Sequence, residues 1–116
     1  MTNSTLMLRQ IHKNFIQNGR VSSQAFRPTP KDKNLLSVYN GDEIQPKDAF
    51  THYTEILGMS SCGVLAVTWK ECDSCGLPVV KDPEPFKEHC VIDFTASSSS
   101  KRRKQSGLLR NFAVTR

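Results

Sequence analysis

Long apolar segments are missing from this sequence. A membrane-spanning helix needs roughly 18 to 20 apolar residues in a row, and no stretch of the 116 residues approaches that length. Near the N-terminus only Leu6-Met7-Leu8 is apolar, which is too short for the core of a secretory signal. The expected location is therefore the cytoplasm, with no membrane contact. In that reducing compartment the four cysteines are expected as thiols or metal ligands rather than as disulfides.

Glycine-rich nucleotide-binding motifs are also missing. The sequence contains neither GxxxxGK followed by Ser or Thr nor GxGxxG, the patterns whose backbone amides hold phosphates. It has no internal repeat either. No motif fixes a reaction, so enzymatic activity is left open and a binding role is favoured over it.

Acidic residues are absent from residues 96–116, which hold six Lys and Arg. Residues 1–95 hold ten Lys and Arg against eleven Asp and Glu, so the net charge of +5 comes from the C-terminal segment. That Ser/Lys/Arg-rich segment has the composition of a disordered tail. We therefore expect a compact domain over 1–95, followed by a disordered basic tail over 96–116. The alternative is that its apolar residues dock as a short helix or strand on the domain or on a partner, namely Leu108, Leu109, Phe112 and Val114.

Two helices are predicted from the spacing of apolar residues. Between residues 6 and 16 this spacing loosely resembles a short amphipathic helix, which Gly19 would stop. The clearest helix is predicted over 46–57, because Pro46 suits a first helical turn and Gly58 suits the residue after the last. Its apolar positions fall on one face: Ala49, Phe50, Tyr53, Ile56 and Leu57.

The remaining patterns favour an α+β fold. Residues 63–68 form a continuous apolar run, typical of a strand buried on both faces. Thr68 and Glu71 match a capping box, which predicts a short helix from Trp69. Further strands are predicted over 35–39, 77–80 and 90–94. The expected fold is a small single domain with a mixed or antiparallel sheet of three to five strands and one main helix.

Cys72-Asp73-Ser74-Cys75-Gly76 has the spacing of half a zinc site. Candidates for a third ligand are Cys90, which is preferred, His89 and Cys62. Against this reading, no second CxxC motif is present, and the capping box favours a helix through Cys72. His89 and Cys90 are neighbours on a predicted strand, so they are expected to face opposite sides. Zinc is therefore a candidate cofactor, with buried apolar cysteines as the alternative.

Two basic segments are candidate contacts for anions. Arg20 and Arg27 flank Ser22 and Ser23, a composition that can hold a phosphate or carboxylate, although a solvated loop is the alternative. In the predicted tail, Lys101, Arg102, Arg103 and Lys104 form a cluster that suits nucleic acid or an acidic protein partner. The alternative is a tail that only increases solubility.

Three functional hypotheses follow. The first is a small binding or regulatory module whose basic tail adds affinity for a protein or nucleic-acid partner. The second is a small enzyme that acts on a phosphorylated or nucleotide substrate through Arg9, Arg20 and Arg27, with a His or a Cys. The third is a structural domain held together by zinc at Cys72, Cys75 and Cys90. The sequence favours them in that order.

Overall fold

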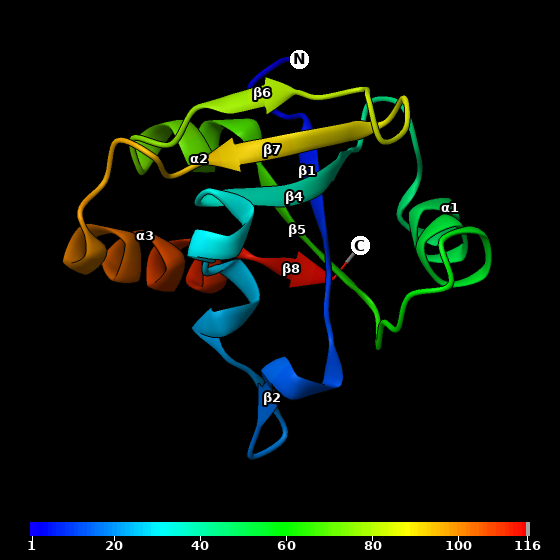
Figure 1. The fold of residues 1–116 in the computed structure, drawn as a ribbon, viewed down its shortest axis with the longest axis horizontal. Coiled ribbons are helices and arrows are strands. Elements are labelled where there is room, and N and C mark those ends of the chain that lie inside the picture. The colour runs from blue at the N-terminus through cyan, green and yellow to red at the C-terminus, as the bar shows by residue number, and fades with distance from the viewer. Residues whose placement is uncertain (116) are drawn as a thin grey trace.

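An antiparallel six-stranded sheet forms the centre of the fold (Figure 1). The computed structural model describes residues 1–115. The strand order is β6–β7–β4–β1–β5–β8, and every pairing is antiparallel. The strands are β1 (Leu6–Gln10), β4 (Leu35–Asn40), β5 (Val64–Thr68), β6 (Val79–Lys81), β7 (His89–Asp93) and β8 (Val114–Thr115). The predicted single α+β domain is confirmed, but the sheet has one strand more than the predicted maximum.

Strand β1 replaces the helix predicted over residues 6–16. It lies between β4 and β5, and its residues Met7 and Leu8 are both fully buried, on opposite faces of the sheet. A central strand covered on both sides has a continuous apolar run rather than an alternating one. The helix prediction was wrong because Leu6-Met7-Leu8 is such a run. A small hairpin follows β1, formed by β2 (Ile16–Gln17) and β3 (Arg20–Val21).

Helix α1 (Pro46–Thr51) continues into a π-helical segment, η4 (His52–Ile56), so a helix over the predicted 46–57 is confirmed nearly to its ends. The Leu57 N–H bonds to the His52 carbonyl, five residues back. Such a turn rotates the residues after it relative to an α-helix. Ala49 lies before this turn and is buried. Ile56 and Leu57 lie at its end and are 72% and 42% exposed. The predicted apolar face therefore no longer points toward the core where the α-helix becomes a π-helix.

Helix α2 (Trp69–Ser74) begins with the predicted capping box. The Glu71 N–H donates to Thr68 Oγ1 at 3.1 Å, and the Thr68 N–H donates to Glu71 Oε1 at 2.8 Å. These two bonds satisfy amides at a helix start that have no partner within the helix. The local sequence alone therefore fixes where α2 begins.

The segment predicted as a disordered tail contains the longest helix, α3 (Ser99–Phe112). Leu109 is fully buried, and the buried Ser106 donates from its hydroxyl to the Phe26 carbonyl at 2.9 Å. Gln105 donates to the Cys75 carbonyl at 2.9 Å. The disorder prediction was wrong because average composition hides a sparse buried stripe at four-residue spacing. Strand β8, the sixth strand, follows this helix, and Arg116 lies outside the described residues.

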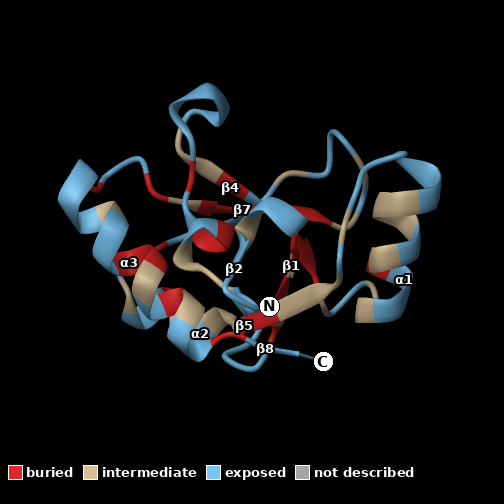
Figure 2. Cartoon of the chain, turned by 90° about the horizontal axis from the view of Figure 1, so that it is seen from below, coloured by how far each residue is buried: buried red, intermediate tan, exposed pale blue. Residues whose placement is uncertain are grey.

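The two faces of the sheet are covered differently (Figure 2). Helices α2 and α3 lie on one side, over a large apolar cluster that includes Met7, Val38, Val67, Cys90 and Leu109. Helix α1 lies on the other side, over a small cluster of Leu8, Tyr39, Ala49 and Ala66. We call these the core face and the cleft face. Among residues 1–115, no helix is long and apolar enough to cross a membrane.

Candidate active site

The two central strands separate part of the way along the sheet. Strand β1 pairs with β4 only at Met7↔Asn40 and Leu8↔Tyr39, although it continues to pair with β5 as far as Gln10↔Val64. Beyond this point the Ser37 carbonyl has no backbone partner on β1. The Arg9 side chain takes that place, because its Nη1 donates to the Ser37 carbonyl at 3.0 Å and its Nε donates to the Ala25 carbonyl at 2.7 Å.

Arg9 lies where two cavities meet. The large cavity, of about 460 Å³, and the small cavity, of about 300 Å³, share Arg9, Asp32 and Ser37 as lining residues. The guanidinium also lies 5.8 Å from the centre of the Phe15 ring. Burial lowers the pKa of Arg9 to about 10, so the group is still charged at neutral pH. The separation of the strands thus holds one desolvated cation at the centre of the site.

The large cavity collects most of the imidazole and phenol groups of the chain. His12 and His89 line it together with Tyr39 and Tyr53. The third histidine, His52, borders it, since its ring packs against Phe86, another lining residue, with ring centres 4.8 Å apart. These residues come from four separate parts of the chain: the end of β1, strand β4, segment η4, and β7 with the loop before it.

Two phenol–imidazole pairs cross this site. Tyr53 Oη lies 3.0 Å from His12 Nε2, and Tyr39 Oη lies 2.8 Å from His52 Nδ1. Burial raises the pKa of Tyr39 to about 12 and raises that of Tyr53, so both phenols stay protonated at neutral pH. Burial, and then the nearby Arg9 charge, lower the pKa of His12. A neutral imidazole hydrogen-bonded to a phenol can pass a proton in either direction.

Gln10 leaves a buried acceptor at the cavity wall. Its side chain is 4% exposed, and its Nε2 donates to the Ala49 carbonyl at 3.1 Å. Its Oε1 has no hydrogen-bond partner within residues 1–115, although Gln10 lines the large cavity. Buried amide oxygens are nearly always hydrogen-bonded in folded proteins. This oxygen is therefore an unsatisfied buried acceptor in a residue that lines the large cavity.

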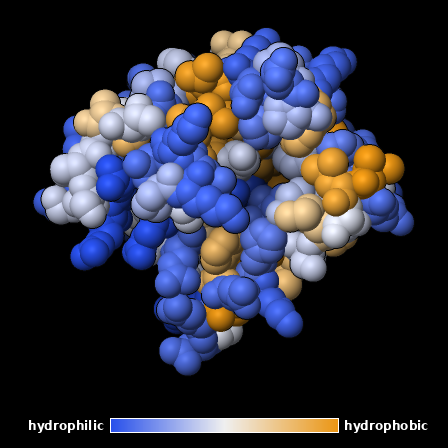
Figure 3. All heavy atoms as spheres, in the orientation of Figure 1, coloured by the Kyte–Doolittle hydropathy of each residue, from blue (hydrophilic) through white to orange (hydrophobic). Residues whose placement is uncertain are grey.

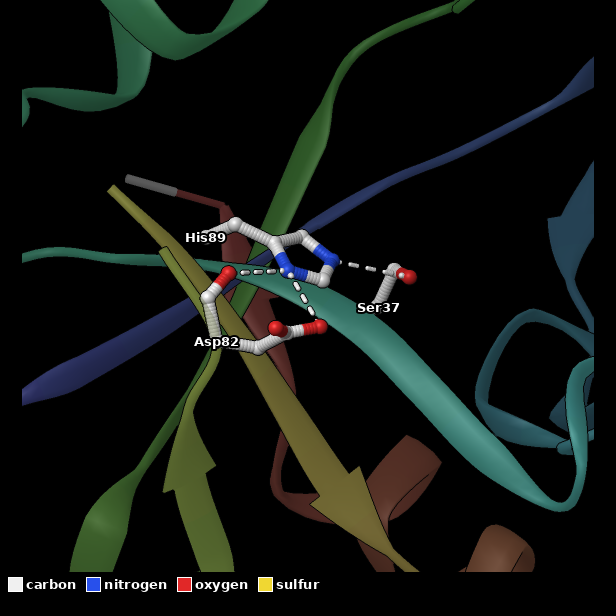
Figure 4. Close-up of polar contacts among 3 residues, drawn as sticks. All are labelled: Ser37, Asp82 and His89. Atoms are coloured by element: carbon white, nitrogen blue, oxygen red, sulfur yellow. Dashed lines mark hydrogen bonds and ion pairs between the residues drawn. The ribbon is translucent and has the colours of Figure 1, made fainter. Parts of the chain in front are cut away.

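Ser37, His89 and Asp82 form a hydrogen-bonded row at the same wall (Figure 4). His89 Nε2 lies 3.1 Å from Ser37 Oγ. On the other side of the ring, His89 Nδ1 lies 2.9 Å from the Asp82 carbonyl oxygen and 3.4 Å from its carboxylate. His89 is buried, whereas Ser37 is exposed to the cavity.

The predicted anion-binding loop is divided by the fold. Arg27 lines the small cavity with Arg9. Arg20 is exposed on the β2–β3 hairpin, and neither it nor Ser22 nor Ser23 lines that cavity. Of the arginines in the second hypothesis, Arg9 and Arg27 therefore lie at the site. Sequence reasoning missed Gln10, Ser37, Tyr39 and Tyr53, although the shared face of Ser37 and Tyr39 follows from their spacing of two on a strand.

The candidate zinc ligands lie on the core face. Cys72 and Cys90 are buried in its apolar cluster, and Cys75 packs against it. Burial raises the pKa of Cys72 to about 12, and it raises those of Cys75 and Cys90. Zinc binding requires the deprotonated thiolate. Within the described part of the chain, no three His, Cys, Asp or Glu side chains are grouped so that they could hold a metal ion.

The predicted basic cluster lies at the start of α3. Lys101, Arg103 and Lys104 are exposed, while Arg102 donates to the Ser97 carbonyl at 2.6 Å. Arg102 and Arg103 border a shallow hollow together with Arg27. The cluster is thus part of a structured surface and lies apart from the large cavity.

An apolar patch borders the large cavity. It consists of Ile56, Leu57 and Met59, and the last two also line the cavity wall. In Figure 3 apolar side chains gather on the side of the molecule where Figure 1 places α1. The site therefore offers one charged wall and one apolar wall to a ligand.

Comparison with known proteins gives this chain no relative. No protein-family model, no curated protein and no solved structure matches it.

Proposed function

We propose that this chain is an enzyme that binds a small phosphorylated substrate in the large cavity and transfers protons through the surrounding imidazole and phenol groups. One observation carries this proposal. A single cavity is lined by the half-buried cation Arg9, the imidazoles of His12 and His89, two protonated phenols, and Gln10, whose buried Oε1 has no partner within residues 1–115. Perturbed ionisable groups that converge in a cavity of this size are typical of active sites.

The anionic part of the substrate is assigned to Arg9. A guanidinium has five N–H donors, and Arg9 uses two of its nitrogens for backbone carbonyls. No carboxylate within residues 1–115 forms an ion pair with it. A partly desolvated cation without an ion-pair partner gains from a bound anion, because less water competes for its N–H donors.

Proton transfer is assigned to the imidazoles. His12 is kept neutral by burial and by Arg9, so it can accept a proton near neutral pH. Its partner Tyr53 stays protonated, and Tyr53 Oη lies 3.0 Å from His12 Nε2, so this hydrogen bond holds the imidazole in place. The apolar patch at the cavity mouth suits an uncharged part of the substrate, such as a base or another ring.

The test is a titration of the full chain, labelled with ¹⁵N at histidine, with inorganic phosphate and with 5′-AMP, followed by NMR of the three imidazoles. We expect saturable shifts at His12 and His89. Arg9→Gln should weaken binding by at least about tenfold, the usual effect of losing one charge-assisted contact. Arg20→Gln, which removes an exposed arginine outside both cavities, should leave it unchanged.

Three results would contradict the proposal. They are an absence of shifts at millimolar phosphate and AMP, equal binding by Arg9→Gln, and acetate binding as tightly as phosphate. Arg9→Lys keeps the positive charge, so it serves as the folded reference if Arg9→Gln is unstable.

The basic start of α3 supports a second candidate function, contact with nucleic acid or an acidic protein. Lys101, Arg102, Arg103 and Lys104 all lie in the first two turns of α3, where positive charge opposes the helix dipole. Binding an anionic partner would relieve that repulsion.

The test of this second function uses substitutions rather than a truncation. Because Leu109 and Ala113 are core residues, removing 96–116 would disrupt the core. The variant to use is therefore Lys101→Gln combined with Lys104→Gln. Binding of a fluorescent 20-nucleotide single-stranded DNA should then weaken and depend less steeply on salt. If the variant binds the DNA as tightly as the unchanged chain does, the basic cluster does not contact nucleic acid.

A further inference from the structure

We infer that Ser37 is a nucleophile, that His89 is its general base, and that Asp82 orients His89. This inference rests on the proposed function in placing a phosphate ester in the large cavity, but its test requires no natural substrate. Nucleophilic serines are recognised by such a row of serine, imidazole and orienting group, independently of fold or of order in the sequence.

The hydrogen bonds of His89 determine which ring nitrogen carries the proton. The Asp82 carbonyl oxygen can only accept a hydrogen bond, and it lies 2.9 Å from Nδ1. Nδ1 must therefore carry the proton, which leaves Nε2 of the neutral ring with a free lone pair. Ser37 Oγ lies 3.1 Å from that lone pair and donates to it. The fold thus holds the imidazole in the tautomer that can take the serine proton.

The sheet fixes the position of both groups. His89 pairs with Tyr39 across β7 and β4, and Ser37 lies two residues before Tyr39, so both side chains are on the cleft face. The Phe86 ring meets the imidazole edge-on, with ring centres 5.1 Å apart. The base is buried while the hydroxyl faces the cavity. A rigid base beside an accessible hydroxyl is the arrangement that nucleophilic catalysis needs.

The groups around this row suit the charges that develop during reaction. When Nε2 takes the serine proton the ring becomes positive, and the Asp82 carboxylate lies 3.4 Å from its Nδ1. The Arg9 guanidinium is held next to Ser37 by its bond to the Ser37 carbonyl, and both residues line the large cavity. A phosphate placed for attack by Ser37 is therefore close to a fixed cation.

The reaction has two balanced steps. Ser37 Oγ forms a bond to phosphorus, its proton passes to His89 Nε2, and the bond from phosphorus to the ester oxygen breaks. The departing oxygen keeps the bonding pair and takes the proton from His89 as an alcohol. Water then attacks the phosphoserine, gives a proton to His89, and releases phosphate as that proton returns to Ser37 Oγ. The sum is a phosphate ester and water giving an alcohol and phosphate.

The test uses a biotinylated fluorophosphonate on the full chain, read by intact mass and peptide mapping. Attack by Ser37 Oγ would form a phosphorus–oxygen bond and expel fluoride with its bonding pair, while the serine proton leaves through His89. We expect one adduct, on Ser37. Ser37→Ala should abolish it, and it should fold because the side chain is exposed. Ser60→Ala, an exposed serine outside the large cavity, should label like the unchanged chain.

The histidine variant separates a catalytic serine from a merely accessible one. His89→Gln should slow labelling at least about 100-fold, the usual contribution of a general base. Asp82→Asn should slow it less, because its carbonyl still fixes the tautomer. If His89→Gln is unstable, the dependence of labelling on His89 is measured instead from the rate in Asp82→Asn and from the pH dependence of the rate in the unchanged chain. The inference would be overturned if no adduct forms, if the adduct forms on a tyrosine instead, or if the labelling rate is the same with and without His89.

The failure of this inference and the failure of the proposed function are distinguishable. Labelling of Ser37 without phosphate binding at Arg9 would keep the nucleophile and reject the phosphorylated substrate. Phosphate binding without labelling would keep the proposed function and reject Ser37.

Discussion

The core face and the cleft face of the sheet are made from the same strands, yet they treat ionisable groups in opposite ways. Neighbouring residues divide between them in pairs: Met7 and Leu8, Val38 and Tyr39, Val67 and Ala66, Cys90 and His89. On the core face the cysteines are surrounded by apolar side chains, and burial is the largest cause that raises the pKa of Cys72 and Cys90. On the cleft face each histidine has a hydrogen-bond partner. Burial disfavours the thiolate form of the cysteines, whereas hydrogen bonds hold the histidines in defined positions.

The largest effect is expected from breaking the core face at α3. Leu109→Ala should lower the free energy of unfolding by about 2–5 kcal/mol, because it leaves a cavity under a fully buried side chain. Leu108→Ala is the matched control, since that side chain is 46% exposed. Urea unfolding of both variants measures the difference. Similar stabilities would mean that α3 does not contribute to the core.

A second prediction concerns thiol reactivity. With a pKa of about 12, Cys72 is a thiolate in only about one molecule in ten thousand at pH 8. The exposed Cys62 should therefore react with Ellman's reagent roughly 100-fold faster than Cys72 or Cys90. Cys62→Ser should remove the fast phase. A fast phase that persists in this variant would show that the core face opens to reagent.

A third prediction sharpens the contrast between the two helices on the core face. Helix α2 has Glu71 as its third residue, whereas α3 has Lys101 at the same place after its capping Ser98. Lys101→Glu would complete a capping box and should stabilise the fold by about 0.5–1 kcal/mol. Lys104→Glu adds the same charge without the box and should stabilise less. If both variants gain the same stability in urea unfolding, the gain comes from the change in net charge and not from the capping box.

The smallest effect is expected from His12 on the cleft face. Its native pKa is lowered, so the unfolded chain binds more protons than the native chain as the pH falls below about 6.5. The contribution of neutral His12 to stability is therefore present above that pH and is lost below it. The stability of His12→Gln relative to the unchanged chain should increase between pH 7.5 and 5.5. A constant difference in urea unfolding would contradict this sign.

The parts of the fold that local rules determine were predictable from the sequence. Pro46 and Gly58 frame the helical segment, the apolar run at 63–68 forms β5, and Thr68 with Glu71 starts α2. The opposite faces of His89 and Cys90 also follow from strand periodicity. Each of these depends on residues only a few positions apart.

The candidate site depends on contacts that no local pattern contains. Tyr53 and His12 are 41 residues apart, and Ser37 and His89 are 52 apart. The cavity exists because β1 leaves β4 after Leu8, and Arg9 fills the resulting gap. Only the pairing of distant strands decides where that separation occurs. Disorder was preferred to a docked helix at α3 for a similar reason, since the partners of its few buried residues are far away in sequence.

Strand β8 has a consequence for how this chain meets copies of itself. It pairs through Leu65↔Thr115 and Ala66↔Val114, so it covers the outer edge of the apolar strand β5. At the opposite edge lies β6, which is three residues long and follows Pro78. Uncovered apolar edges pair with other chains and lead to aggregation. The two residues of β8 thus cover the edge of β5. A chain truncated after Ala113 would expose that edge to pairing with other copies, although it would keep every residue of the candidate active site.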